Sequence, residues 1–553
     1  MGQHHSLDTR GVSALASHLA DGSPAEKKKA ATALSKLSKL EASQVAAVGS
    51  DVVRPLVALV RDGSKGHKTV ATLALAKLST SSENRTAMVT AGGIPVLVKL
   101  MGIGNSAQKD NAMSVLFNLC MNSSYRLEIA ALGAIPSLVT LIRDGGSIQR
   151  EKAAGVLASL ATNVKNQAEI ISAQGIRPLV DVVRYDATGA RVNALSALWA
   201  LSADDAAKAT IVAAGGVELL VKQLKSEGEY PKEVAAGTLW NLSMAKENRA
   251  AIVAAGATSP LLELLRTGND IHKIRAVSAL ANLAGIPDCQ FAIVTSGGIV
   301  SVVALMKNGT SSQKECALTT LSKLSGSSSR INAALAAPGI VAVVVEMMRS
   351  GSNSVKQDAV RMLANLSAGS YNSVIVLAGA IPHLVSLLWK DCTSVRRKAV
   401  MVLANMAVEP MNRVAIATAG GISPLLMLVR DGEEDLKEMA TFALSDLAKN
   451  PENKVAIRAA GGVKAFVRLL EVGNKAQKQN AALALSILYL DSRSTAAVVA
   501  GGGIIPLMVL ARGGVDQEKV YTTQMLSNPF ASTSSSSSSL RWNPACEDGY
   551  WCM

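Results

Sequence analysis

A glycine-containing tripeptide recurs every 41 residues along the chain, for example Gly92-Gly93-Ile94. The first residues of its copies, including two substitutions, are Gly92, Gly133, Gln174, Gly215, Gly256, Gly297, Pro338, Gly379, Gly420, Gly461 and Gly502. Two further steps of 41 toward the N-terminus reach Asp51 and Arg10, which gives thirteen units. A constant period of this length predicts a helical solenoid, in which each unit packs only on its neighbours.

The most regular part of each unit is a segment such as residues 108–119, and Asn118 serves here as its reference position. Leu stands two residues before the reference in all thirteen units, and Ala stands six before it in twelve. This spacing places both residues on one face of a helix. We expect Leu to fill the layer between units and the small Ala to let the neighbouring helix approach. The register slips by one residue between 348 and 372, so that Asn365 is the reference of its unit.

Each unit is predicted to contain three helices. A short helix over residues 83–91 ends at the glycine, which tolerates the backbone angles of a helix C-terminus. A second helix follows, and it often carries proline in its first turn, where the N–H has no helical partner. These prolines are Pro95, Pro136, Pro178, Pro382 and Pro424. The third helix is the segment that ends near the reference position.

The sequence therefore predicts an all-α fold, a solenoid of about thirteen 41-residue repeats whose first and last copies are incomplete. We predict a solenoid over residues 10–528, preceded by an N-terminal segment, residues 1–9, and followed by a flexible Ser-rich tail, residues 529–553. The aromatic content of only 3% agrees with thin helical layers built from Ala, Leu and Val.

The residues 92–98, Gly-Gly-Ile-Pro-Val-Leu-Val, and the helix finish at 235–243 resemble the armadillo family. The closest resemblance is to plant U-box and fungal vacuolar armadillo proteins, and it covers residues 10–528. It implies a right-handed superhelix whose third helices line a concave groove. The repeats leave no room for a U-box, so ubiquitin-ligase activity is not implied. The HEAT family is the alternative, but its units have two helices and lack this glycine.

On the third helix, the reference position and those four and seven before it share one face. The resemblance implies that this face lines the groove. Asn occupies the reference position at Asn118, Asn241, Asn282, Asn365 and Asn405. An amide both donates and accepts, so it matches a peptide group, and in the family such a ladder binds extended peptides. The alternative interpretation is that these side chains only cap local backbone.

Basic residues stand at the same groove positions: Lys36, Lys77, Lys323, Arg275, Arg361 and Lys398. With the net charge of +14, they favour an acidic or phosphorylated partner segment. The alternative is a solvated face that only keeps the chain soluble. Importin-α carries Trp four before each groove Asn, whereas this chain has Ser114, Gly237, Ser278, Arg361 and Met401 there. Nuclear transport is therefore a disfavoured alternative. Trp199 and Trp240 are candidates for an aromatic contact patch or for ordinary packing.

A second basic column stands nine before the reference in all thirteen units. Its members are Lys27, Lys68, Lys109, Arg150, Arg191, Lys232, Lys273, Lys314, Lys356, Arg396, Lys437, Lys478 and Lys519. It lies about 180° around the helix from the reference. The column is either a basic stripe for anionic partners or a row of stems that cover apolar surface, and stem burial alone accounts for it.

No catalytic constellation, metal-ligand spacing or cofactor motif is present in the sequence, so we expect neither an enzyme nor a bound cofactor or metal. The uncharged run between Arg493 and Arg512 is interrupted by glycines and Pro506, and it is assigned to a repeat rather than to a membrane helix. The start Met1-Gly2-Gln3-His4-His5-Ser6 fits the N-myristoylation pattern at Gly2. A single acyl chain holds a membrane only weakly.

We therefore expect a monomeric, non-catalytic scaffold that binds extended segments of partner proteins in an Asn- and Lys/Arg-lined groove, without nucleic acid. We expect a cytoplasmic location. The alternatives are a membrane-tethered adaptor acylated at Gly2 and a nuclear transport adaptor.

Overall fold

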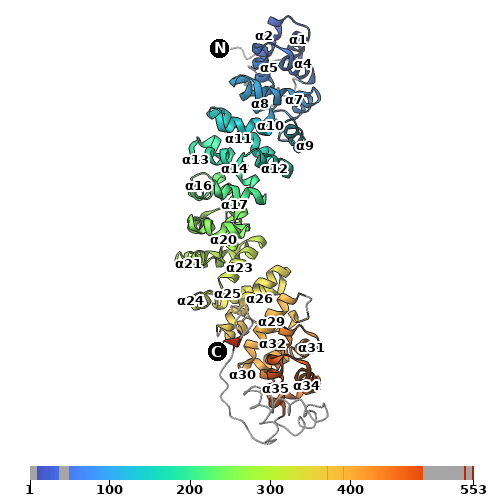
Figure 1. Cartoon of the computed structure of the whole chain (residues 1–553), viewed down its shortest axis with the longest axis vertical. Coiled ribbons are helices and arrows are strands. Elements are labelled where there is room, and N and C mark those ends of the chain that lie inside the picture. The colour runs from blue at the N-terminus through green and yellow to red at the C-terminus, as the bar shows by residue number, and fades with distance from the viewer. Residues whose placement is uncertain are drawn as a thin grey trace. The chain divides into compact units, whose positions relative to one another are not determined.

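The computed structural model describes residues 9–35, 49–369, 371–389, 392–489, 541–542 and 551–552. It divides into an N-terminal unit, Met1–Ile286, and a C-terminal unit, Pro287–Met553. Both are built from α-helices, which Figure 1 shows in chain order. The only strands in the described ranges are β1 (Arg541–Trp542) and β2 (Trp551–Cys552), which pair antiparallel.

The first helices of the repeats are short. They are α6 (Ser82–Thr90), α9 (Ser123–Ala131), α12 (Val164–Ser172), α15 (Asp205–Ala213), α18 (Lys246–Ala254), α21 (Pro287–Thr295), α24 (Ser329–Leu335), α27 (Asn372–Leu377), α30 (Pro410–Thr418) and α33 (Pro451–Ala459). Arg85 shows how this helix is joined to the end of the preceding third helix, because its guanidinium donates to the carbonyls of Ser79 and Thr80 at 3.0 Å each. Arg126, Arg249 and Arg413 make the equivalent bonds in their repeats.

Where the repeat carries its glycine, from Gly92 onward, the second helix begins one or two residues after it. The second helices are α1 (Thr9–Ala20), α4 (Gly49–Asp62), α7 (Gly93–Ile103), α10 (Ala134–Asp144), α13 (Ile176–Tyr185), α16 (Gly216–Leu224), α19 (Thr258–Thr267), α22 (Gly298–Asn308), α25 (Pro338–Ser350), α28 (Ala380–Leu387), α31 (Ile422–Asp431) and α34 (Gly462–Val472). The predicted proline positions are confirmed, because all five prolines lie in the first turn of a second helix.

The turn between first and second helices needs a left-handed backbone, which explains the periodic glycine. Gly92 has φ 72°, and the equivalent glycines have similar values. Gln174 occupies the same position at φ 56°, so this repeat holds a side chain where glycine is favoured. Pro338 cannot adopt a positive φ, and there the chain enters α25 through an extended Ala337.

The third helices stack on one another within each unit. In the N-terminal unit they are α2 (Pro24–Ser35), α5 (Lys65–Leu78), α8 (Ser106–Leu119), α11 (Ser147–Leu160), α14 (Thr188–Leu201), α17 (Glu229–Met244) and α20 (Asp270–Leu283). In the C-terminal unit they are α23 (Ser311–Leu324), α26 (Asn353–Ala368), α29 (Thr393–Ala407), α32 (Glu434–Leu447) and α35 (Lys475–Tyr489). In every described repeat, the Leu two before the reference and the Ala six before it are buried, which confirms the predicted core.

The register slip has a structural counterpart. The third helix α26 spans 16 residues, and the first helix α27 that follows has 6 residues instead of the 9 found in α30. The extra residue before α26 is thus recovered by the shortened α27, and the following repeats regain their frame.

Candidate functional site

The Asn ladder connects successive third helices. Each amide Nδ2 donates to a serine at the end of the preceding third helix, 38 to 40 residues earlier. The pairs are Asn118–Ser79 at 2.8 Å, Asn241–Ser202 at 2.9 Å, Asn282–Ser243 at 3.0 Å, Asn365–Ser325 at 2.9 Å and Asn405–Ser367 at 3.1 Å. The ladder therefore has a structural task, close to the local capping that was the alternative interpretation.

The serine hydroxyl fixes the direction of these bonds. Ser202 Oγ donates to the Trp199 carbonyl at 2.6 Å, so its lone pairs are left to accept from Asn241 Nδ2. The amide oxygen and the second N–H of Asn241 then remain. Within the described residues, Oδ1 of Asn241 accepts no hydrogen bond, and the same holds for Asn118, Asn282 and Asn365.

Asn405 requires a correction. We predicted that it lines the groove, but the structure buries it completely, with 0% of its surface exposed. Its amide donates to Ser367 Oγ inside the packed layer. A ligand does not reach this side chain, so Asn405 belongs to the repeat interface.

The sequence carries a signal for this arrangement, but the signal lies in pairs of consecutive repeats and not within a single helix. Each described reference Asn follows a repeat that carries Ser two residues after its own reference. Where that residue is Cys120, Ala161, Ala284, Ala407 or Ala448, the next reference is instead Ser159, Ala200, Lys323, Asp446 or Ile487. Lys77 after Ser38 and Asn528 after Tyr489 depart from the rule, and Ser38 and Asn528 lie outside the described residues.

Two further positions of the third helix bond to the preceding one. Seven before the reference, Arg275 donates to the Glu233 carbonyl at 2.8 Å. The same type of hydrogen bond, to the backbone carbonyl of the residue 42 positions earlier, is donated by Lys152, Asn193 and Asn480. Ten before the reference, Gln108, His272 and Gln477 bond to the carbonyl 43 residues earlier. Side chains on one face of these third helices thus hold them against their N-terminal neighbours.

Two of the predicted groove cations are engaged inside the protein. The Arg275 guanidinium forms a 2.8 Å ion pair with Glu233 and stacks 4.3 Å from the centroid of the Trp199 ring. Burial lowers the pKa of Arg275, and Glu233 opposes this effect. Arg361 pairs with Asp358 at 2.7 Å and donates to Ser322 Oγ at 2.7 Å.

The other cations differ in access. Lys77 is exposed, and Lys323 is half-buried. Lys398 is also half-buried, and within the described residues its amine makes no hydrogen bond or ion pair. Burial lowers the pKa of Lys398, and the like charges of Arg361 and Arg397 lower it further. Lys36 lies outside the described residues, as do Gly2 and the uncharged run between residues 493 and 512, so these remain predictions.

In the second basic column, the aliphatic parts of the Lys and Arg side chains are partly buried. Every member from Lys27 to Lys478 is half-buried. Arg150 forms a two-pronged pair with the Asp186 carboxylate, with a closest distance of 2.6 Å, and Lys232 pairs with Glu229 at 3.2 Å. This burial favours the interpretation that the stems cover apolar surface while the charges reach water.

A hollow of about 590 Å³ opens among the third helices α8, α11, α14 and α17 of the N-terminal unit. Its lining includes Phe117, Trp199, Tyr230 and two amides of the groove face, Asn193 and Asn241. Trp199 of the predicted aromatic patch therefore does face a cavity. Trp240 is half-buried and is not among the lining residues of this hollow.

The comparisons with known proteins address the repeat directly. The model of the plant U-box protein ARM repeat region matches residues 299–526. The model of the armadillo/β-catenin-like repeat matches residues 204–244 and 245–285, two consecutive copies in the predicted frame. The chain belongs to the armadillo-repeat family. It is an all-α solenoid of a family of protein-binding scaffolds.

Solved structures show the same armadillo fold. A crystal structure of an engineered protein from the Northeast Structural Genomics Consortium is 30% identical, with a TM-score of 0.61, over 71% of this chain and 98% of that one. A second structure comes from work on a conserved phosphorylation switch that controls the interaction between cadherin and β-catenin. It is 18% identical, with a TM-score of 0.61, over 93% of this chain and 99% of that one. The comparison with curated proteins gives no match.

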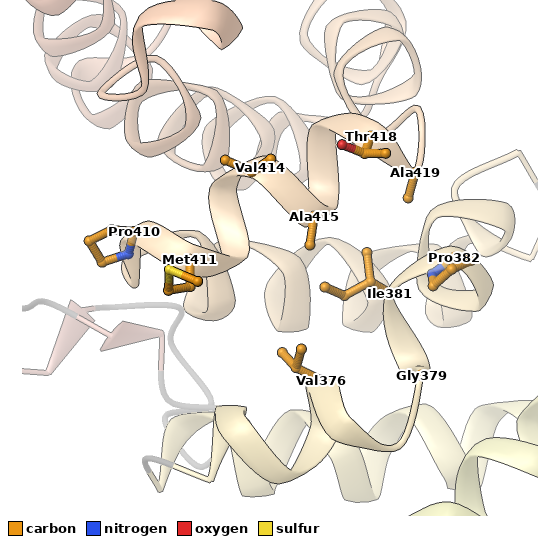
Figure 2. Close-up of a pocket in the computed structure, with 10 residues that line it drawn as sticks. All are labelled: Val376, Gly379, Ile381, Pro382, Pro410, Met411, Val414, Ala415, Thr418 and Ala419. Carbon is orange, nitrogen blue, oxygen red and sulfur yellow. The ribbon is translucent and has the colours of Figure 1, made fainter.

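A second hollow of this armadillo protein lies in the C-terminal unit, and its lining residues belong to first and second helices and the turns between them. It measures about 770 Å³ and opens between the shortened first helix α27, the start of α28 and α30 (Figure 2). Val376, Ile381, Met411 and Val414 contribute apolar side chains to it. Met411 is 85% exposed.

Helix length and side-chain clustering bear on membrane and metal binding in the described part of the armadillo chain. No single helix there is both long and apolar enough to cross a bilayer, although five bent pairs of consecutive helices reach the required length and composition together. Nor does that part bring three or more His, Cys, Asp or Glu side chains together in a way that could hold a metal ion.

Proposed function

We propose that this armadillo chain is a non-catalytic scaffold that binds an extended segment of a partner protein along its third helices. The observation that carries the proposal is the state of the Asn ladder in the N-terminal unit. Asn118, Asn241 and Asn282 are half-buried, and in the described structure each has an amide oxygen that accepts no hydrogen bond. An amide held in place by one bond is pre-organised to receive a backbone N–H with its free oxygen.

The net charge of +14 supports a partner segment that is acidic or phosphorylated. Of the groove cations, Lys77 is exposed and Lys398 lacks an acceptor within the described residues, so these two are suited to meet a ligand charge. Arg275 and Arg361 already have carboxylate partners and contribute mainly to packing.

The test is selection of random peptides displayed on phage against the full chain, compared with the double variant Asn241→Ala/Asn282→Ala. We expect peptides rich in Asp and Glu, whose binding is lost in the variant. A matched control is Ser202→Ala/Ser243→Ala, which removes the same inter-repeat hydrogen bonds but keeps both amides. Equal loss in both variants would mean that repeat stability, and not amide recognition, governs binding.

The charge component is tested separately with Lys77→Glu and Lys398→Glu. We expect weaker binding of the acidic peptides and a smaller dependence of affinity on salt concentration. Selected peptides without acidic bias, or with affinities that neither substitution changes, contradict the acidic-partner part of the proposal. Circular dichroism on each variant checks that the helices remain folded.

A further inference from the structure

Two glycines on third helices of the N-terminal unit let aromatic rings of the preceding helix approach closely, and one of them, Gly155, lines the hollow. Gly155 and Gly237 both stand four residues before a reference position. A Cβ atom on Gly155 would lie 3.4 Å from the Phe117 ring, and one on Gly237 would lie 2.9 Å from Trp199 Nε1. Glycine within a helix costs stability, so its presence here reflects the close approach of these aromatic rings.

The aromatic rings are held in place by their neighbours while part of their surface stays open. Trp199 is covered on one side by the Arg275 guanidinium. The Tyr230 hydroxyl lies 2.9 Å from Ser196 Oγ, which anchors that ring at the edge of the hollow. Phe117 and Tyr230 nevertheless remain 44% and 46% exposed. Large apolar rings fixed at a cavity edge are typical of an anchor pocket in a protein interface.

The charges at the hollow argue against a cationic side chain as its occupant. Among the described residues that line it, none is acidic, so a buried Lys or Arg of a ligand would find no counter-charge. The single cation of the lining, Arg126, already donates to the Cys120 carbonyl at 2.6 Å and to Thr162 Oγ1 at 2.7 Å. The lining therefore combines neutral polar groups with aromatic surface.

We infer that this hollow receives one large uncharged side chain, aromatic or aliphatic, of the extended partner segment. The inference rests on the proposed function, because the groove amides hold the backbone of the same segment. Asn193 and Asn241 are among the lining residues, and their side chains are tied to the preceding helix through their Nδ2 groups. The partner segment thus carries an apolar anchor among its acidic residues.

The experiment uses one peptide obtained from the phage selection and measures its affinity for four combinations of protein and ligand. The protein is the full chain or its Gly155→Leu variant, whose side chain projects into the hollow. The ligand is the selected peptide or the same peptide with its bulky residue changed to Ala. We expect the Ala peptide to bind the wild-type chain at least about tenfold more weakly. We also expect Gly155→Leu to bind both peptides equally, at the weaker level.

Two outcomes overturn the inference. One is a set of selected peptides with no bulky uncharged residue at a fixed place. The other is an equal effect of the anchor change on both proteins. In either case, if Asn241→Ala/Asn282→Ala still abolishes binding, the proposed function stands and only the anchor pocket fails. Tyr230→Ala gives a second route to the same answer, since it removes an exposed wall of the hollow without adding volume.

Discussion

In three pairs of the N-terminal unit, a large aromatic residue just before the reference faces a small residue four before the next reference. These pairs are Phe117/Gly155, Trp199/Gly237 and Trp240/Ser278, whereas Ala76/Ser114 and Ala158/Ser196 are small at both positions and Ser35/Leu73 has the larger residue on the later helix. In the C-terminal unit the sizes are reversed, in the pairs Ser322/Arg361, Ala364/Met401, Ala404/Phe442 and Ser445/Leu483. The two positions of a pair lie in contact across neighbouring third helices. Examples are Gly155 with Phe117, Gly237 with Trp199 and Arg361 with Ser322.

The comparison shows that the two positions share one volume between neighbouring third helices. Protein interiors pack densely, so one residue of a pair grows only when the other shrinks. In the N-terminal unit the aromatic ring comes from the earlier helix, and a hollow remains beside the glycine. In the C-terminal unit the later helix supplies the larger residue, such as Met401, which is buried. One scaffold therefore carries two different surfaces on equivalent helices.

The largest expected effect comes from breaking one pair. Gly237→Leu forces a side chain against Trp199 Nε1 and the Arg275 guanidinium, and it should destabilise the chain by about 1–3 kcal/mol. Adding Trp199→Ala removes the indole ring and makes room for the new Leu side chain. The double variant should therefore be more stable than the sum of the two single effects predicts. Urea unfolding followed by circular dichroism measures each midpoint. Strictly additive effects would falsify the shared-volume account.

A smaller effect is expected from the hydrogen bonds of the ladder. Asn241→Ala and Ser202→Ala each remove the same 2.9 Å bond, and each should lower the free energy of unfolding by about 1 kcal/mol. The double variant should cost little more than either single one, because the two changes remove one shared interaction. Calorimetric or urea midpoints check this prediction. An independent loss for each residue would show that they do not act as a pair.

Asp446 allows the pairing of a reference Asn with a Ser of the preceding repeat to be tested in the C-terminal unit. Here the preceding repeat carries Ala407 in place of that Ser, and Asp446 occupies the reference position in place of Asn. Burial raises the pKa of the Asp446 carboxyl above 3.8, and the Lys449 amine beside it opposes this shift. The folded state then holds the proton more tightly than the unfolded chain. The resulting stabilisation is present below pH 3.8 and is lost as pH rises through the folded pKa.

The double substitution Asp446→Asn/Ala407→Ser removes this buried charge and installs the ladder bond. At pH 7 it should raise the free energy of unfolding by about 1 kcal/mol. The gain should shrink as pH falls toward 3.8, because the wild-type carboxyl becomes protonated there. Urea unfolding at several pH values is the measurement, with Asp446→Asn alone as the control. A gain of constant size across pH would mean that the charge of Asp446 carries no penalty.

The smallest effect is expected in the second basic column. Lys232→Met keeps the apolar stem and should change stability by less than about 0.5 kcal/mol. Lys232→Ala removes the stem as well and should cost somewhat more than Lys232→Met. The exposed partner Glu229 makes the ion pair itself worth little. If Lys232→Met proves as costly as Lys232→Ala, the charge and not the stem is the stabilising part.

The fold could be predicted from the sequence because each signal is repeated. The buried Leu and Ala, the first-turn prolines and the glycine turn each recur at a constant offset, so chance matches are averaged out. Even the one-residue slip before Asn365 was visible, because the pattern resumes after it. Departures such as Gln174 at a positive φ are local adjustments to a backbone that the repeat already determines.

The site was less predictable because its decisive partners lie about 40 residues apart. Asn241 by itself indicates a free amide, and only the pairing with Ser202 in the preceding repeat shows how half of it is used. Likewise, the charge of Arg275 is visible in the sequence, but its neutralisation by Glu233 depends on the stacking of two helices. The hollow is lined by residues of several repeats, so the sequence of a single repeat carries no signature of it.

The hydrogen bonds between third helices also give the stack a direction. At the three bonding positions the donor mostly lies on the later helix and the acceptor on the earlier one, as in Asn282–Ser243, Arg275–Glu233 and Gln477–Glu434. Asp358 is an exception, because it accepts from Thr319 on the preceding third helix. Deleting a repeat on the C-terminal side leaves carbonyls that are still bonded within their own helix. Deleting one on the N-terminal side strands half-buried N–H groups, which are costly to leave unpaired. The chain should therefore tolerate shortening from its C-terminal end better than from its N-terminal end, with each repeat serving as the platform for the next.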